Sequence, residues 1–229
     1  MNYTYLLINF LTILFPLTLS FDKKVAFHKK WQYLWPGLAI TGVVFLFWDI
    51  LFTVDGVWSF NPYYTIGINI LQLPIEEILF FLTVPFACTF IYVCLNYYMK
   101  REMDMRLTRI ISNVIIILSI LILIFYHHRL YTRVTFTLLA FLVIIFQFIY
   151  KARWLNRFYA AFAVALVPFY IINGILTSLP VVIYNNAQNL GIRIGTIPVE
   201  DHFYLMALLL LNIGFYEYFR AKKNNIHHA

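Results

Sequence analysis

The sequence predicts an all-α integral membrane protein, with seven transmembrane helices arranged as two parallel three-helix repeats joined by a linker helix. Three observations lead to this prediction. Of the 229 residues, 62% are hydrophobic and only 12% are charged, whereas charged residues make up about 25% of an average soluble domain. Seven apolar runs are long enough, or nearly so, to cross a bilayer. The two halves of the chain also match each other at a constant offset of 124 residues.

The seven apolar runs follow one another with short polar segments between them. A helix needs about 20 predominantly apolar residues to cross a bilayer. Asp49 interrupts the second run and Asn173 interrupts the sixth. The first run has neither a basic leader nor a small-residue cleavage site, so we expect a retained span rather than a signal peptide. The runs are 3–21, 35–53, 73–98, 108–126, 133–150, 157–179 and 198–219.

Basic residues lie almost entirely on one side of the predicted membrane. Of the 17 Lys and Arg residues, all but Arg129, Arg133 and Arg193 fall after the first, third and fifth runs or in the C-terminal tail. Because cytoplasmic segments are enriched in Lys and Arg, we expect the N-terminus outside and the C-terminus in the cytoplasm. Glu217 lies near the basic tail and is expected to form an ion pair there.

A proline followed by two acids heads the third and seventh runs. The copies are Pro74–Glu77 (PIEE) and Pro198–Asp201 (PVED), and the match extends without a gap over residues 49–81. Carboxylates beside hydrocarbon are expensive and usually functional. The match predicts a first repeat at 1–100, a linker with the fourth span at 101–130 and a second repeat at 131–229. A two-fold axis along the membrane normal is expected to relate the repeats.

The four motif acids are the candidate catalytic residues: Glu76, Glu77, Glu200 and Asp201. A carboxyl group desolvated by hydrocarbon can hold its proton, which general acid catalysis requires. Neighbouring residues on a helix project about 100° apart, so one acid of each pair is expected to face a cavity and the other to support it. Because Glu occupies the first position in both copies, Glu76 and Glu200 are expected to be the primary acids. Capping of the helix start is the alternative.

Other polar residues near the motifs are candidate supporting groups. Asp49 and Asn173 are equivalent in the repeat; Asp49 either exchanges a proton with the motif acids or holds helices together, and the amide at 173 indicates that the two half-sites differ. His202 follows the second motif directly. A histidine with a pKa near 6.5 either relays a proton or anchors the helix at the membrane interface.

Two long loops precede the motifs, at residues 55–72 and 180–196. Asn61 and Asn185 are equivalent positions within them and are added to the supporting polar groups. Loops of this length are either binding elements or plain connectors.

Aromatic residues follow the motifs at near-helical spacing. Aromatic faces can stabilise a cation without reacting as nucleophiles, so these side chains are candidates to line a site for a carbocation. The alternative is contact with lipid. The candidates that follow the motifs are Phe80, Phe81, Phe203 and Tyr204, and Trp48, beside Asp49, is added to them.

Several motifs are absent from the sequence. It has no glycine-rich dinucleotide fingerprint and no phosphate-binding loop, and no Cys/His cluster with metal-ligand spacing. No basic patch with interleaved aromatic residues indicates nucleic acid binding. We therefore expect no cofactor, no metal and no nucleic acid partner.

Together these features resemble the small membrane lycopene cyclases of the heterodimer type, in the form in which both halves are fused. The resemblance rests on the two motifs at 74–77 and 198–201 with their trailing aromatic residues. Phe47–Asp49 and Gly56–Phe60 also look like the first-half pattern of that family. The similarity covers essentially the whole chain except the fourth span.

The resemblance implies a lycopene β-cyclase, an intramolecular lyase or isomerase of carotenoid biosynthesis in the bacterial inner membrane. In that reaction an acid protonates carbon 2 of linear lycopene, the carbocation closes a ring, and loss of a proton from carbon 6 gives the β-ring of β-carotene. The substrate would be dissolved in the membrane lipids. A second copy of the chain and other carotenoid enzymes are the partners left open.

Two other functions stay open at this point. Parallel repeats with paired acids are also compatible with a transporter that relays protons. A non-catalytic carotenoid-binding protein is the third hypothesis.

Overall fold

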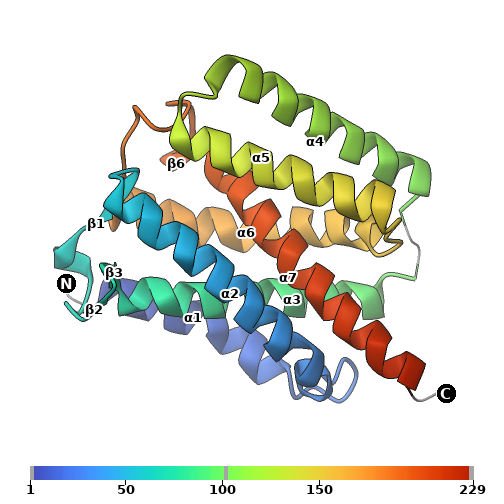
Figure 1. Ribbon diagram of the computed structural model, residues 1–229. Coiled ribbons are helices and arrows are strands. Elements are labelled where there is room, and N and C mark those ends of the chain that lie inside the picture. Colours follow the sequence, from blue (N-terminus) through green and yellow to red (C-terminus); the bar gives the residue numbers. More distant parts are fainter. Residues whose placement is uncertain (1–2, 101–102, 227–229) are drawn as a thin grey trace.

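The structure is a computed structural model that describes residues 3–100 and 103–226, and within these ranges it is a bundle of seven α-helices (Figure 1). Arg101, part of the predicted basic segment, lies outside the described residues, as do the outermost ends of the predicted repeats. The helices are α1 (Thr4–Leu19), α2 (Trp31–Val54), α3 (Ile75–Tyr98), α4 (Met105–Tyr126), α5 (Leu130–Ile144), α6 (Leu155–Ser178) and α7 (Val199–Ile226).

The all-α prediction is confirmed, and five helical segments are long and apolar enough to cross a membrane. Two helices fall short for different reasons. Helix α1 is apolar but has only 16 residues, and α7 starts with two acids and ends in a basic tail. Seven spans and the two-repeat arrangement therefore stay predictions. The five segments are Phe27–Val54, Ile75–Tyr98, Met105–Tyr126, Leu130–Ile149 and Leu155–Ser178.

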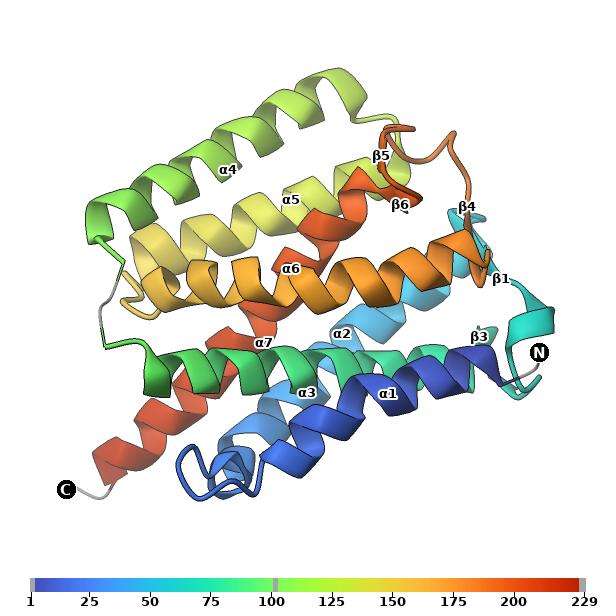
Figure 2. The same cartoon turned by 180° about the vertical axis from the view of Figure 1, so that it is seen from behind.

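Motif helices α3 and α7 form the centre of the bundle. Helix α3 packs against α1 and α6, whereas α7 packs against α2 and α5 (Figures 1 and 2). Helix α4 packs on α5 at one edge. The contacts between α2 and α7 and between α6 and α3 join segments from opposite halves of the chain. Gly37 lets the first pair approach closely, because a Cβ there would lie 2.9 Å from the Cβ of Phe215.

Helix α5 ends in a π-helical turn, η3 (Ile145–Ile149). Gln147 in this turn is buried and accepts a hydrogen bond from Ser112 of α4 at 3.0 Å. A π-turn shifts the side chains that follow it, and here it directs a polar side chain toward the neighbouring helix.

Short strands gather at one end of the bundle, called the strand end below (Figure 1). Hairpins β2–β3 (Asn69–Ile70, Leu73–Pro74) and β5–β6 (Arg193–Ile194, Ile197–Pro198) lead directly into the motif helices. Strand β1 (Trp58–Phe60) pairs antiparallel with β4 (Val182–Tyr184), and Trp58 lies opposite Tyr184. The two long loops are therefore joined to each other. Short 3-10 turns η1 (Phe27–Lys30) and η2 (Pro62–Tyr64) complete the structure.

Candidate active site

A small cavity of about 60 Å³ lies at the strand end between the two halves of the chain. Three carboxyl groups line it, from Asp49, Glu77 and Asp201. We call this cavity, with these three acids, the carboxyl chamber. Helices α2, α3 and α7 each contribute one acid. The other lining side chains are mostly aromatic and include Tyr5, Trp58, Phe60, Phe80, Phe81, Tyr131, Phe169, Tyr184 and Tyr204.

Asp201 is held by three hydrogen bonds. The Tyr131 hydroxyl donates to one carboxylate oxygen at 2.6 Å, and the Tyr184 hydroxyl and the Asn173 amide donate to the other at 2.8 and 2.7 Å. These donors come from α5, β4 and α6. Burial, and then the neighbouring Asp201 carboxylate, raise the pKa of Tyr184 well above its ordinary value. This phenol therefore stays a donor at neutral pH.

Glu77 and Asp49 have fewer donors than Asp201. The Tyr5 hydroxyl of α1 donates to Glu77 Oε2, and the Trp58 indole N–H donates to Asp49 Oδ1 at 2.7 Å. Asp49 Oδ2 is buried and has no hydrogen-bond partner among the described residues. Glu77 is near enough to both other acids to interact with them electrostatically. Like charges so close in a dry site disfavour ionisation of all three acids together.

The first acid of each motif lies elsewhere. Glu76 and Glu200 are fully buried, yet neither lines the carboxyl chamber. Glu76 Oε1 accepts from the Ile66 backbone N–H at 2.7 Å, and Glu200 Oε1 accepts from the Leu190 N–H at 2.6 Å. These bonds tie each long loop to the motif helix that follows it.

One acid of each pair therefore faces the cavity while the other supports the loop, as the helical geometry predicted. The acids that line the chamber are the second of each pair, Glu77 and Asp201, whereas Glu76 and Glu200 were expected to be the primary acids; that catalytic assignment stays a prediction. The loop segment just before each hairpin lies over the first turn of the motif helix, so the N–H groups of Ile66 and Leu190 meet the carboxyl of the first acid. The second acid, one residue further round the helix, faces the bundle interior.

The same hydrogen bonds recur 124 residues apart. The N–H of Val57 donates to Phe52 and that of Val181 to Leu176, at 2.9 and 2.8 Å. The loop bonds to the two first-position glutamates follow the same offset. The chamber itself is asymmetric, because Asn173, the counterpart of Asp49, is a hydrogen-bond donor rather than an acid.

The remaining predicted residues divide between the chamber and its surroundings. Phe80, Phe81 and Tyr204 line the chamber. Trp48 packs behind it, with its ring 4.8 Å from that of Tyr204. Phe203 faces away and packs on a phenylalanine of α5.

Three polar residues expected near the site act outside the chamber. His202 is buried and contacts the Tyr170 hydroxyl at 3.0 Å. Asn61 accepts from the Tyr63 N–H at 3.0 Å, and Asn185 donates to the Gly56 carbonyl at 3.1 Å. Both asparagines shape the loops rather than the cavity.

The four aromatic side chains that donate hydrogen bonds to the chamber acids were not among the sequence candidates: Tyr5, Trp58, Tyr131 and Tyr184. Trp58 was quoted only as part of the pattern at 56–60. Tyr5 and Tyr131 are separated by 126 residues rather than 124. An alignment of the two halves that allowed an offset of 126 instead of 124 in the first helix of each repeat would have paired these two tyrosines.

An apolar groove of about 420 Å³ lies beside the carboxyl chamber, between α1, α3 and α6. Its wall is formed by residues such as Thr12, Ala87, Cys88, Ala165 and Ile172. The groove and the chamber share four lining residues: Phe80, Phe169, Asn173 and Leu205. No group of His, Cys, Asp or Glu side chains in the described part of the chain is arranged to hold a metal ion.

The fold and site define a class of protein: an α-helical protein whose long apolar helices suit a membrane, with a buried carboxyl site beside an apolar groove. The lycopene cyclase family model matches residues 2–95 and 128–219, which is most of the chain. The chain belongs to the lycopene cyclase family, and this membership supports a role as an enzyme that cyclises lycopene. Comparison with curated proteins and with solved structures gave no match.

Proposed function

We propose that the protein is a lycopene β-cyclase that converts linear lycopene to β-carotene by an acid-initiated reaction without net redox change. The observation that supports this best is the carboxyl chamber, in which three buried acids face an aromatic lining beside an apolar groove. Buried acids supply and remove protons, aromatic faces stabilise a carbocation, and the groove suits a hydrocarbon chain.

The proton donor in this proposal is Glu77. Hydrogen bonds donated to a carboxylate favour its ionised form, and Asp201 receives three of them whereas Glu77 receives one in the described structure. A proton held by the three acids together would therefore lie on Glu77 or Asp49 rather than on Asp201.

The reaction balances within the chamber. Protonation of carbon 2 leaves a cation at carbon 1, the double bond between carbons 5 and 6 attacks it through carbon 6, and the new bond between carbons 1 and 6 leaves the cation at carbon 5. Loss of the proton from carbon 6 restores a double bond and completes the β-ring. Asp201 is the base in this proposal, because its three donors hold it as an oriented carboxylate.

The aromatic lining stabilises the cation between these steps. Tyr204 has its ring against Trp48 and its buried hydroxyl has no partner among the described residues. Phe80 and Phe81 complete one wall. Where water is excluded, a cation over an aromatic face is stabilised by about 2 kcal/mol or more.

The rest of the polyene would lie in the apolar groove. At about 60 Å³ the chamber is far smaller than a typical ligand pocket of roughly 300–1,000 Å³, whereas the groove at about 420 Å³ lies within that range. Phe80 and Phe169 line both spaces, so we propose that these two rings move to admit the end of the chain.

We further propose that the chain consists of repeats 1–100 and 131–229 with a linker at 101–130. The recurring hydrogen bonds support this division, as does a family match in two parts that leaves α4 out. The distribution of basic residues supports an N-terminus outside and a C-terminus in the cytoplasm of a bacterial inner membrane.

Product analysis tests the proposed function. The chain is expressed in cells that accumulate lycopene, and their carotenoids are separated by chromatography. We expect β-carotene. Unchanged lycopene beside well-expressed, folded protein would overturn the cyclase proposal, and a ring with another double-bond position would overturn its β-type.

A further inference from the structure

A second set of functional groups lies at the end of the bundle opposite the strand end, where α2 and α6 begin and α3 and α7 end. A hollow of about 380 Å³ there is lined by four cationic side chains, Lys29, Lys30, Arg157 and Arg220, together with Tyr33 and Tyr97. We call it the basic hollow. Its cations come from three segments that are far apart in the sequence.

The described lining of the basic hollow carries positive charge and no carboxylate of its own. Glu217 lies in an adjoining hollow and forms an ion pair with Arg220 at 3.0 Å, as expected from the sequence. This carboxylate offsets the charge of Arg220.

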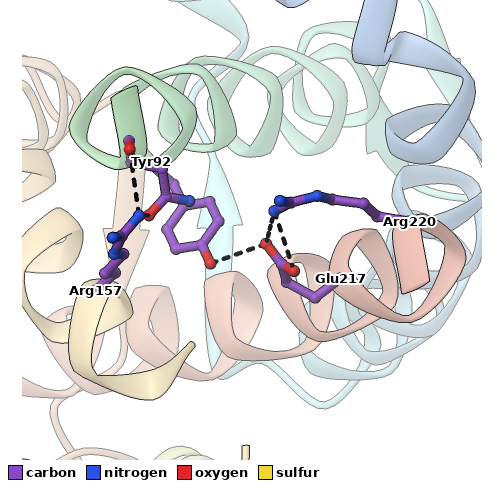
Figure 3. Close-up of polar contacts among 5 residues, drawn as sticks. Tyr92, Arg157, Glu217 and Arg220 are labelled. Atoms are coloured by element: carbon purple, nitrogen blue, oxygen red, sulfur yellow. Dashed lines mark hydrogen bonds and ion pairs between the residues drawn. The ribbon is translucent and has the colours of Figure 1, made fainter. Parts of the chain in front are cut away.

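The two arginines of the basic hollow are held in place. Figure 3 shows Glu217 between Arg220 and Tyr92, whose hydroxyl donates to the carboxylate at 2.9 Å. Arg157 donates to the backbone and side-chain oxygens of Asn96 at 3.2 and 3.3 Å. These bonds join α3, α6 and α7, so both guanidinium groups face the hollow from a fixed wall.

Basic residues that only set membrane topology need to lie on the correct side, but they need not converge. Lys222 illustrates the difference, because it follows Arg220 by two residues and is in neither set of lining residues. Membrane topology therefore does not explain why four cations converge on one hollow, and the convergence indicates a binding site for an anionic ligand.

We propose that the basic hollow binds a phosphate group, carried by an anionic lipid headgroup or by a free phosphate compound. Arginine binds phosphate oxygens in a planar fork and lysine binds them as a point charge. Basic pockets between transmembrane helices are known to hold phosphorylated headgroups, and tyrosine side chains favour the depth of the headgroups. This site is separate from the carboxyl chamber, and its ligand is independent of lycopene.

Ligand binding to the purified full-length chain in neutral detergent tests the proposal. Phosphatidylglycerol, phosphatidylcholine and inorganic phosphate are titrated separately, and binding is followed by native mass spectrometry and thermal unfolding. Binding of phosphatidylglycerol alone assigns the hollow to an anionic lipid, and binding of inorganic phosphate as well assigns it to free phosphate compounds. Binding of neither, or equal binding of phosphatidylcholine and phosphatidylglycerol, overturns the proposal.

Substitutions of single residues test whether the phosphate group binds in the basic hollow. Each of Arg157→Gln and Arg220→Gln should weaken binding about 5-fold, and the double variant about 30-fold, given the usual contribution of one basic residue to anionic lipid binding. Glu217→Gln should strengthen binding, a gain that misfolding cannot produce. Lys222→Gln removes the same charge from the same end but outside the hollow, and should weaken binding less than Arg157→Gln does. An equal loss in this control and in Arg157→Gln would mean general charge attraction and would overturn the site.

Discussion

Replacing Glu77 by glutamine tests whether Glu77, rather than Glu76, is the proton donor of the first motif. Glutamine keeps the size of the side chain and an oxygen that can accept from the Tyr5 hydroxyl, so the chamber should keep its shape. The change removes the transferable proton. General acid catalysis contributes about 10²–10⁴-fold to a rate, which corresponds to about 2.7–5.5 kcal/mol at about 1.36 kcal/mol for each tenfold. We therefore expect turnover of lycopene to fall by about 10²–10⁴-fold.

Glu76→Gln is the matched control, because it changes the same atoms one residue earlier. Its amide oxygen can still accept from the Ile66 N–H, and the side chain does not line the chamber. Turnover should fall less than about 10-fold, equivalent to about 1.4 kcal/mol. Initial rates of ring formation are measured chromatographically with membranes that contain lycopene, and thermal unfolding verifies that both variants fold. A larger loss for Glu76→Gln than for Glu77→Gln would refute the assignment of the proton donor.

Three further changes test other parts of the structure. Tyr184→Phe removes one donor from Asp201 and should lower the free energy of unfolding by about 1.5–3 kcal/mol, equally at about pH 8 and about pH 9, because the raised pKa keeps this phenol protonated. Leu71→Gly should raise stability by about 0.5–1 kcal/mol in thermal unfolding, because Leu71 has a left-handed backbone with φ of 49°. Thr12→Phe narrows the apolar groove and should raise KM for lycopene on the order of 10-fold, whereas Leu7→Phe on the exposed face of α1 should not.

Controls accompany the first two of these changes. Tyr218→Phe alters an exposed tyrosine and should leave stability within about 0.5 kcal/mol. Ile70→Gly, beside Leu71 but without a positive φ, should lower stability because glycine adds unfolded-state entropy there. A stability loss for Leu71→Gly as large as that for Ile70→Gly would contradict backbone strain at the hairpin. An unchanged KM for Thr12→Phe would show that the polyene does not use the groove.

The helices and the position of the motifs could be predicted from the sequence. The apolar runs and the polar segments between them indicated the helices, and Pro74 and Pro198 marked the residues just before α3 and α7. The prediction that Glu217 forms an ion pair is also confirmed. These features depend on local composition, which the sequence gives without any knowledge of tertiary packing.

The internal arrangement of the chamber could not be predicted in the same way. Helical spacing says that Glu76 and Glu77 diverge, but the direction of each depends on the long loop, whose Ile66 N–H meets the carboxyl of Glu76 at the helix start. Tyr5 and Tyr131 reach the chamber only because α1 packs on α3 and α5 packs on α7. Such contacts follow from tertiary packing, which a single sequence does not reveal.

The pairing of β1 with β4 has a consequence for biosynthesis. Strand β1 ends at Phe60, but its partner begins at Val182, so the ribosome must add more than a hundred residues before the pair can form. At about 5–20 residues per second this takes roughly 6–25 seconds. During that interval the newly made first half has an unpaired strand edge at β1. Its chamber acids, Asp49 and Glu77, also lack the lining residues that the second half contributes. The nascent protein is therefore most exposed to mispairing with other chains, or to capture by a quality-control protease, before its second half emerges.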